Sequence, residues 1–360
     1  MLFTPFDLGD LHLRNRLVMS PLTRNRAIGN IPNALMATYY GQRATAGLII
    51  TEGTSPSPNG LGYARIPGLF NEAHVAGWKL VTDAVHARGG KIVVQLMHTG
   101  RISHQDNLPS GAEVIGPMAV NAPGEIWTDG QGNQPHPSPR AMNADDIAQT
   151  VAEYANAARL AMDAGFDGVE LHAANGYLLE QFLNANVNQR IDAYGGSAEG
   201  RNRLVLEVAR AVIGEIGATR VGIRLSPYGV FNATGEFSGI DEQYVALVQQ
   251  LSSLGLMYVH LLDHSAMGAP QVPAELKTKL SEAFAGPLIL AGGFDKATAE
   301  QALSEGSADL VAMGRAYLAN PDLLERLRRD APLNAPKPET FYTPGEQGYI
   351  DYPTLREEER

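Results

Sequence analysis

Residues Gly168–Phe182 read GVELHAANGYLLEQF: an apolar strand pattern, a short polar turn and the start of an apolar, helix-like run. The strand pattern ends on His172, and Asn175 and Tyr177 follow in the turn. Strand, turn and helix in this order form the repeating unit of parallel α/β folds, whose active sites lie where the strands end. A purely structural turn with a capping asparagine would have the same pattern. The rest of the chain must therefore distinguish an active-site turn from a structural one.

The same alternation recurs along the chain. The expected strands are Arg16–Met19, Leu48–Thr51, Ile92–Leu96, Gly168–His172, Val221–Leu225, Tyr258–Leu262, Leu288–Ala291 and Leu310–Met313. Helical spacing lies between them at Asn33–Ala46, Glu72–Arg88, Ala144–Ala164, Arg201–Ile216, Asp241–Leu254 and Lys296–Glu305. An open dinucleotide-binding sheet should show G-x-G-x-x-G after its first strand, but that turn reads Ser20-Pro21-Leu22-Thr23. The pattern therefore predicts an α/β fold, a single (β/α)8 TIM barrel over residues 1–360.

Two segments interrupt the alternation of strands and helices. Residues 101–142, between the third strand and its helix, carry six prolines and five glycines. So long a loop after a strand is expected to be a lid or a pocket wall. Residues 331–360 form a proline-rich C-terminal tail ending in REEER, and we expect its last residues to be a solvated, frayed end.

Composition narrows the class of protein. Hydrophobic residues make up 44% of the chain, but no apolar run approaches the roughly 18 residues that span a bilayer. The absence of cysteine excludes disulfides and cysteine-bound metal centres, and we expect no metal. A net charge of −11 argues against nucleic-acid binding. With no signal-peptide pattern at the start, we expect a cytoplasmic protein, either a monomer or a homodimer, that acts on small molecules.

Polar and small residues gather at the expected strand ends. They are Pro21, Leu22, Thr23, Glu52, Gly53, Gln95, His172, Asn175, Tyr177, Arg224, Gly292, Gly293, Gly314 and Arg315. His172 and Asn175 can both donate to one oxygen, and the Tyr177 phenol, with an ordinary pKa of roughly 10, can deliver a proton. Two donors for an oxyanion and one proton source suit chemistry on an activated carbonyl compound.

The last two strand ends are typical of a phosphate site. Such barrels commonly bind phosphate with the loops after strands seven and eight and a short extra helix, for which residues 316–320 are the candidate. Gly292, Gly293 and Gly314 allow close approach of backbone N–H groups, and Arg315 adds a guanidinium group. Gln95, Thr23 and the fixed charge of Arg224 suit the edge of a flat heteroaromatic ring. A phosphorylated isoalloxazine satisfies all of these partners, whereas a sugar phosphate leaves Gln95 and Thr23 unexplained.

The chain resembles the old yellow enzymes, FMN-dependent ene-reductases on a TIM barrel, and within them the bacterial N-ethylmaleimide and nitrate-ester reductases. The similarity runs from about Leu2 to Pro353. It rests on PLTRNRA at Pro21, ITEGT at Ile50, QLxHxGR at Gln95, ELHAANGYLLEQFL at Glu170, NQRIDAYGGS at Asn188, RLSP at Arg224, AGGF at Ala291 and MGRAYLANPDL at Met313. The resemblance implies tightly but non-covalently bound FMN, reduction by NADPH or NADH, and reduction of the C=C bond of enones and maleimides. Nitro compounds and nitrate esters are further implied substrates.

The resemblance also implies residue roles. His172 and Asn175 match the pair that holds the substrate oxygen, and Tyr177 matches the proton donor. Thr23, Gly53, Gln95 and Arg224 match contacts of the flavin ring, with Pro21 and Leu22 beside them, and Gly292, Gly293, Gly314 and Arg315 match the phosphate cradle. Tyr63, Met97 and Tyr342 fall at the substrate pocket. Met97 departs from the family's usual tryptophan, which weakens any inference about substrate preference, and Gly200 replaces a common asparagine.

Other functions predict different observations. A flavin-free aldolase or isomerase would be colourless, and no lysine lies at a strand end to form a Schiff base. The dienoyl-CoA reductases share the barrel but need cysteine-bound iron–sulfur clusters, which this chain cannot hold. A flavin-storage protein would not need His172, Asn175 and Tyr177 to converge over the ring.

Overall fold

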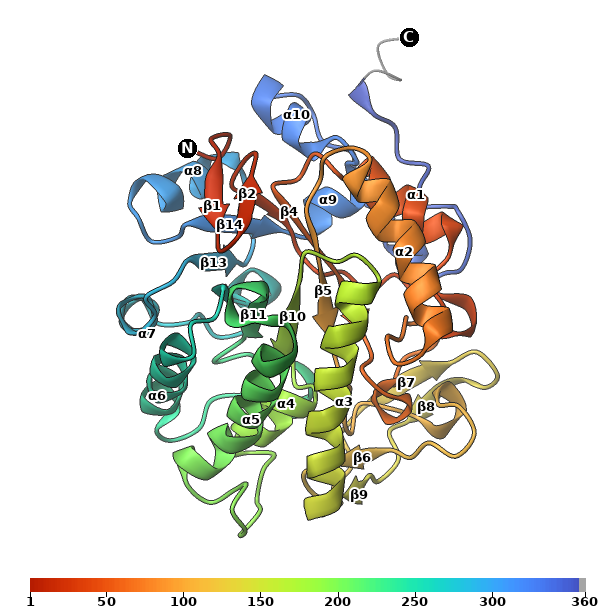
Figure 1. Ribbon diagram of the computed structural model, residues 1–360, viewed down its shortest axis with the longest axis vertical. Coiled ribbons are helices and arrows are strands. Elements are labelled where there is room, and N and C mark those ends of the chain that lie inside the picture. Colours follow the sequence, from red (N-terminus) through yellow and green to blue (C-terminus); the bar gives the residue numbers. More distant parts are fainter. Residues whose placement is uncertain (356–360) are drawn as a thin grey trace.

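The computed structural model describes residues 1–355, and its centre is a closed barrel of eight parallel strands (Figure 1). Its strands are β3 (Leu17–Met19), β4 (Leu48–Thr54), β5 (Ile92–Leu96), β10 (Gly168–Ala173), β11 (Val221–Leu225), β12 (Tyr258–Leu262), β13 (Leu288–Ala291) and β14 (Leu310–Met313). Pairing of β14 with β3 and of β5 with β10 closes the ring. The predicted (β/α)8 barrel is confirmed, with its strands within three residues of the predicted bounds.

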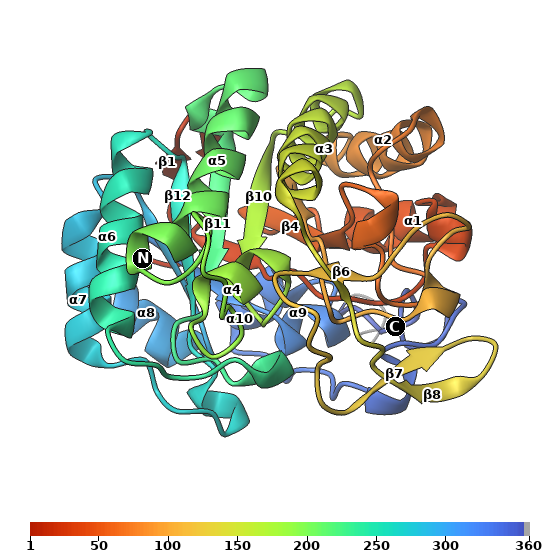
Figure 2. The ribbon, with the colours of Figure 1, turned by 90° about the horizontal axis from the view of Figure 1, so that it is seen from below.

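Helices surround the barrel (Figure 2). The main ones are α1 (Ala34–Gln42), α2 (Glu72–His86), α3 (Ala144–Asp163), α5 (Ala198–Ile216), α6 (Ile240–Ser253), α7 (Ala274–Ala283) and α8 (Lys296–Ser304). Shorter helices are α4 (Leu178–Leu183), α9 (Arg315–Ala319) and α10 (Leu323–Arg329). The sequence analysis did not predict α7, because only Leu276 and Leu280 of its ten residues are buried and the apolar stripe is weak.

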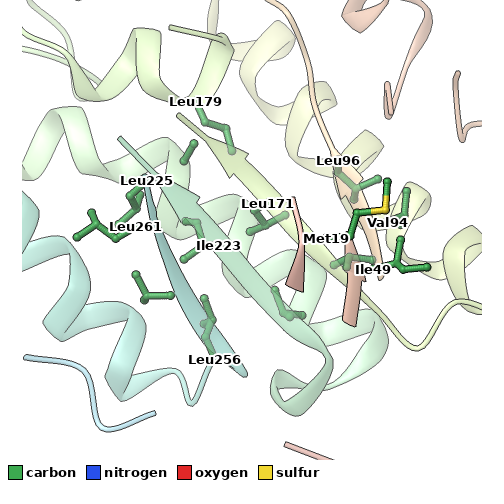
Figure 3. Packing of buried hydrophobic residues seen from close by; sticks show 14 of the residues in the cluster. Met19, Ile49, Val94, Leu96, Leu171, Leu179, Ile223, Leu225, Leu256 and Leu261 are labelled. Atoms are coloured by element: carbon green, nitrogen blue, oxygen red, sulfur yellow. The ribbon is translucent and has the colours of Figure 1, made fainter. Parts of the chain in front are cut away.

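Alternation along each strand divides the apolar residues between two cores. Met19, Ile49, Val94, Leu171 and Ile223 belong to the cluster that packs the outer face of the barrel against the helices (Figure 3). The intervening residues point inward, and those on β3, β4, β13 and β14 are apolar. This inner cluster includes Val18, Leu48, Ile50, Ile289, Leu310 and Ala312.

The inner face of the other four strands is polar toward the C-terminal end. There β5, β10, β11 and β12 present Gln95, Glu170, His172, Arg224 and His260, all buried. A parallel barrel is normally filled with apolar side chains, so buried polar groups at these positions indicate binding or catalysis rather than packing. This half of the barrel mouth is the candidate site.

Segments outside the barrel close its two ends. The hairpin of β1 (Phe6–Leu8) and β2 (Leu11–Leu13), which the sequence analysis missed, adds Leu8, Leu11 and Leu13 to the inner core. The loop 101–142 contains β6 (Ile115–Gly116), β9 (Arg140–Ala141) and a hairpin of β7 (Glu125–Thr128) and β8 (Gly132–Pro135). Figure 2 shows this hairpin beside the C-terminal segment.

The C-terminal segment is bound across the barrel mouth by two buried arginines. Arg24 donates to the carbonyl oxygens of Phe341 and Gly348, and Arg26 donates to those of Thr340 and Phe341. Tyr349 is fully buried and stacks on Tyr39 with ring centroids 4.1 Å apart. The tail is therefore a structural part of the mouth as far as residue 355, and the frayed end expected at 356–360 lies outside the described residues.

Candidate active site

Strand register brings the predicted ring-contacting residues together. Gly53 pairs with Gln95 across a β-bulge in β4, and His172 pairs with Arg224. Parallel neighbours whose side chains point to the same face lie side by side, so residues 42 to 52 positions apart in sequence share one surface. Gln95 and Arg224 lie on the two strands that flank β10, and their assignment to the edge of a flavin ring stays a prediction.

His172 is a buried, neutral imidazole. Burial, followed by the positive charge of Arg224, holds its pKa well below the usual range. Its Nδ1 has no hydrogen-bond partner among residues 1–355, and the same is true of Arg224 Nε and Asn175 Oδ1. Leaving a buried polar atom unpaired costs roughly 1–3 kcal/mol, so these three atoms are suited to a ligand.

The turn that carries Asn175 and Tyr177 has an unusual backbone. Asn175 has a φ of 58° and Gly176 a φ of 72°, both in the left-handed region. Glu180 on α4 stabilises this turn, because its carboxylate accepts a hydrogen bond from Gly176 N at 2.5 Å. Ser226 Oγ donates to the same carboxylate and accepts from Asn175 N at 2.9 Å. The turn thus places Asn175 and Tyr177 next to the end of β10.

Tyr177 is a protonated phenol at the wall of a cavity. Burial raises its pKa above the usual value, and its hydroxyl lies 3.1 Å from the hydroxyl of Tyr63. Its ring contacts that of His172 edge to face, with centroids 5.0 Å apart. The cavity has a volume of about 760 Å³, and Thr23, Tyr63, Tyr177 and Tyr342 line it. Four of the predicted residues therefore share one opening.

The loop 101–142 forms part of the same wall. Glu125, Ile126, Trp127, Asp129 and Asn133, from the β7–β8 hairpin and its turn, line the cavity. The wall expected of this loop is present, whereas movement as a lid stays a prediction.

Met97 lies against Gly53. A Cβ atom at Gly53 would lie 2.4 Å from Met97 Sδ, so a larger residue there would displace the methionine. Met97 belongs to an apolar cluster with Leu61 and Ile66, against which Tyr63 and Tyr177 pack. Met97 thus packs against Tyr63 and Tyr177, which line the cavity, and its place in the substrate pocket stays a prediction.

The glycines after β13 and β14 lie where the backbone is crowded. Gly292 has a φ of 140°, and a Cβ there would lie 2.3 Å from the carbonyl oxygen of Asp263. Gly293 has a φ of 76°, and a Cβ there would lie 2.5 Å from Ala266 Cβ. Gly314 immediately precedes α9, the predicted short helix, which begins one residue earlier than expected. Arg315 is exposed on that helix, and its assignment to a phosphate stays a prediction.

The sequence analysis missed several residues that support the site. Glu170, Glu180, Ser226 and His260 are buried beside predicted residues, and Arg65 lines the cavity. Glu170 could have been suspected, because it is a charged residue in an apolar strand and lies two positions before His172, on the same face.

Comparison with known proteins identifies the family. Residues 1–334 match the NADH:flavin oxidoreductase / NADH oxidase family. The chain belongs to this family. As a flavin oxidoreductase it is expected to bind FMN and a nicotinamide reductant, and the unpaired buried atoms of His172, Asn175 and Arg224 fit such a ligand.

Relatives of this flavin oxidoreductase are old yellow enzyme-like. A probable flavin mononucleotide-dependent alkene reductase of Leishmania infantum is 44% identical over 99% of the chain and 98% of its own length. The 12-oxophytodienoate reductase 1 of Oryza sativa subsp. japonica is 42% identical over 99% of the chain and 93% of its own length. A structure of morphinone reductase in complex with tetrahydroNAD superposes with a TM-score of 0.93 at 43% identity, covering 98% of this chain and 97% of the other.

These findings confirm the predicted family and the class of enzyme, an FMN-dependent oxidoreductase of the old yellow enzyme type. They leave the bacterial branch, the substrate and the choice between NADH and NADPH as predictions. In residues 1–355, no helix combines the length and the apolar character that crossing a membrane requires.

Proposed function

We propose that the enzyme reduces the C=C bond of α,β-unsaturated carbonyl compounds such as enones and maleimides, and also accepts nitro compounds or nitrate esters. The observation that supports this most is the constellation at the end of β10. It comprises His172 and Asn175, each with a buried polar atom that has no hydrogen-bond partner among residues 1–355, beside the protonated phenol of Tyr177. Bound FMN supplies the hydride chemistry that the protein itself lacks.

The substrate oxygen is held by His172 and Asn175. Because His172 is neutral, it donates a hydrogen bond without adding a proton, and the Asn175 amide donates a second. Together they withdraw electron density from the conjugated alkene, which makes its β-carbon the electron-poor position. Ser226 and Glu180 keep the Asn175 backbone in place for this task.

The proton is held on Tyr177 Oη. Burial keeps the phenol protonated over the physiological range, and the Tyr63 hydroxyl 3.1 Å away orients it. Tyr177 can then protonate the α-carbon of a substrate bound in the cavity that both tyrosines line. Tyr342 and Met97 are proposed to shape the same pocket.

The flavin contacts are proposed for residues around the mouth. Thr23, Gly53, Gln95 and Arg224 would lie along the ring, next to Pro21 and Leu22, and Gly292, Gly293, Gly314 and Arg315 would hold the phosphate. The reductant, NADH or NADPH, would enter by the cavity that the alkene uses. We also propose that the protein is cytoplasmic, that it belongs to the N-ethylmaleimide reductase-like branch and that it is a monomer or a homodimer.

Anaerobic half-reactions test the proposal. Purified enzyme should carry a yellow chromophore that denaturation releases as FMN, should bleach with NADH or NADPH, and should regain colour on addition of N-ethylmaleimide or 2-cyclohexenone. A colourless protein that takes up no FMN would contradict the flavin assignment. Flavin that bleaches but regains no colour with any enone, maleimide, nitro compound or nitrate ester would contradict the alkene and nitro chemistry alone.

A further inference from the structure

A buried carboxylate connects three polar residues inside the barrel. Glu170 lies on the inner face of β10 and is fully buried. Its Oε1 accepts a hydrogen bond of 2.7 Å from Gln95 Nε2 on β5. Its Oε2 lies 2.9 Å from His260 Nδ1 on β12, which is the strand beyond β11. Glu170 therefore connects a side chain on β5, on one side of β10, with a side chain on β12, two strands away on the other side.

The charges of this group can be assigned. Burial lowers the pKa of His260, so its imidazole is neutral and donates from Nδ1. Burial raises the pKa of Glu170, but the contact with the His260 ring, followed by the positive charge of Arg224 and the hydrogen bond from Gln95, outweighs it, and the net shift is downward. Glu170 is thus the negative counterpart of Arg224, which lies on the neighbouring strand with its Nε unpaired in the described part of the chain.

We propose that Glu170 is a positioning residue for the flavin, which fixes the amide orientation of Gln95 and offsets the charge of Arg224. This inference rests on FMN binding at the barrel mouth. It assigns a function to a residue that would lie beneath the ring contacts rather than among them.

The amide orientation follows from the donor at Gln95. An amide group offers one oxygen acceptor and two N–H donors, and a carboxylate accepts only. With one N–H committed to Glu170, Gln95 keeps its Oε1 and the second N–H for a ligand. The flipped amide would set its oxygen against the carboxylate, so Glu170 excludes that orientation.

The charge balance follows from burial. A fixed positive charge beside a flavin stabilises the negative charge that the ring gains on reduction. The carboxylate of Glu170 opposes that effect in a region with little solvent to screen either group. Glu170 should therefore keep the reduction potential of the flavin lower than Arg224 alone would set it.

The decisive variant is Glu170→Gln, which keeps the shape and removes the charge. We expect the flavin reduction potential to shift to a more positive value. The Kd for FMN should rise about 5- to 10-fold, because the single amide oxygen cannot accept from both Gln95 and His260 and the orientation of the Gln95 amide is no longer fixed. Equilibrium dye titration measures the potential, and fluorescence titration of apoprotein with FMN measures the Kd. The control is Glu207→Gln, which neutralises a glutamate on α5, outside the barrel, whose carboxylate accepts a hydrogen bond from Tyr194. It should leave both quantities near wild type.

Glu170→Asp serves as a second variant should the first fail to fold. It keeps the negative charge but withdraws the carboxylate by one methylene, so the Kd for FMN should rise while the potential stays near wild type. Wild-type affinity, potential and flavin absorbance spectrum in the variants that fold would overturn the proposal. Wild-type protein that binds no FMN would instead contradict the proposed function.

Discussion

Tyr177 illustrates how one residue acquires a function from its surroundings. A phenol in water loses its proton near pH 10, whereas burial raises the pKa of Tyr177 above that value. The group therefore keeps its proton at neutral pH, and only a strongly basic partner, such as the carbanion-like α-carbon left when hydride adds to the β-carbon of the alkene, can take it.

Tyr177→Phe tests this residue. We expect the reoxidation of reduced enzyme by an alkene to slow about 100-fold or more, the usual contribution of a general acid. Reduction by nicotinamide should change by less than about twofold, because it needs no proton from the protein. Stopped-flow absorbance of the flavin measures both steps. Tyr63→Phe is the control, since it removes the partner of Tyr177 but keeps the acid. Equal slowing of the two steps would remove Tyr177 from the proposed role.

At the scale of elements, the turn between β10 and α4 depends on Glu180. Its carboxylate accepts hydrogen bonds from Gly176 N, Ser226 Oγ and Tyr244 Oη, at 2.5, 3.0 and 3.3 Å. Burial raises the pKa of Glu180 to about 7 despite these three donors. The left-handed backbone at Asn175 and Gly176 therefore relies on one acceptor with no close substitute.

Glu180→Gln should disturb this turn. The amide group brings a donor against three existing donors, so we expect a loss of about 1–3 kcal/mol in the free energy of unfolding. Displacement of Asn175 should slow the alkene half-reaction about tenfold and leave nicotinamide reduction nearly unchanged. Urea denaturation and stopped-flow absorbance measure the two effects. Glu52→Gln should lose stability without slowing the alkene step, and a similar slowing there would show that the turn is not specifically involved.

At the scale of the whole molecule, charge affects the choice of reductant. The chain carries a net charge of −11, and the cavity wall includes Glu125, Asp129 and Glu339. Arg65 on the same wall is paired with Asp129 and donates to the Tyr342 carbonyl oxygen. An additional phosphate on the reductant therefore meets net negative charge.

We expect kcat/KM to be about tenfold higher for NADH than for NADPH at low salt. Salt screens charges over roughly 10 Å at 0.1 M, so the ratio should fall as ionic strength rises. Steady-state rates at several salt concentrations measure it. Glu125→Gln should lower the ratio, and Glu199→Gln, an exposed glutamate on α5, should not. A preference for NADPH that salt leaves unchanged would contradict this expectation.

Buried histidines set the response of stability to pH. Burial lowers the pKa of His74, His98, His136, His172, His260 and His264. The unfolded chain takes up these protons near pH 6.5, so it binds more protons than the folded chain below that pH and stability falls. Burial raises the pKa of Glu52, Glu153 and Glu180, which acts in the opposite direction between about pH 4.5 and 7, but these carboxyls are fewer.

The free energy of unfolding should therefore be lower at pH 5.5 than at pH 7.5, as urea denaturation would show. Each histidine contributes up to about 1.4 kcal/mol per pH unit. His98→Asn is the matched variant, because it keeps an acceptor for the Gly100 N–H and removes a group whose pKa is about 3. It should reduce the slope by about one proton, and an unchanged slope would show that His98 does not contribute.

Much of the fold could be predicted because its signals are local. Each barrel strand is a short apolar run followed by a turn, so eight strands, their order and their C-terminal ends could be placed from periodicity. Helix α7 was not predicted, because only two leucines form its buried stripe. The β1–β2 hairpin was not predicted, because strands of three residues are too short to show a recognisable alternation of apolar and polar side chains.

The residues of the candidate site also fall into those with a local sequence signal, which could be predicted, and those without one, which could not. His172, Asn175, Tyr177, Gln95 and Arg224 could be named because the end of a strand marks the catalytic face of a barrel. The partners that hold such residues come from distant parts of the chain: Gln95 and Glu170 are 75 residues apart, Glu170 and His260 are 90, and Arg24 and Gly348 are 324. Local patterns fix which face a side chain occupies, whereas barrel closure and strand register fix which side chains meet on it. Those pairings exist only in the folded chain.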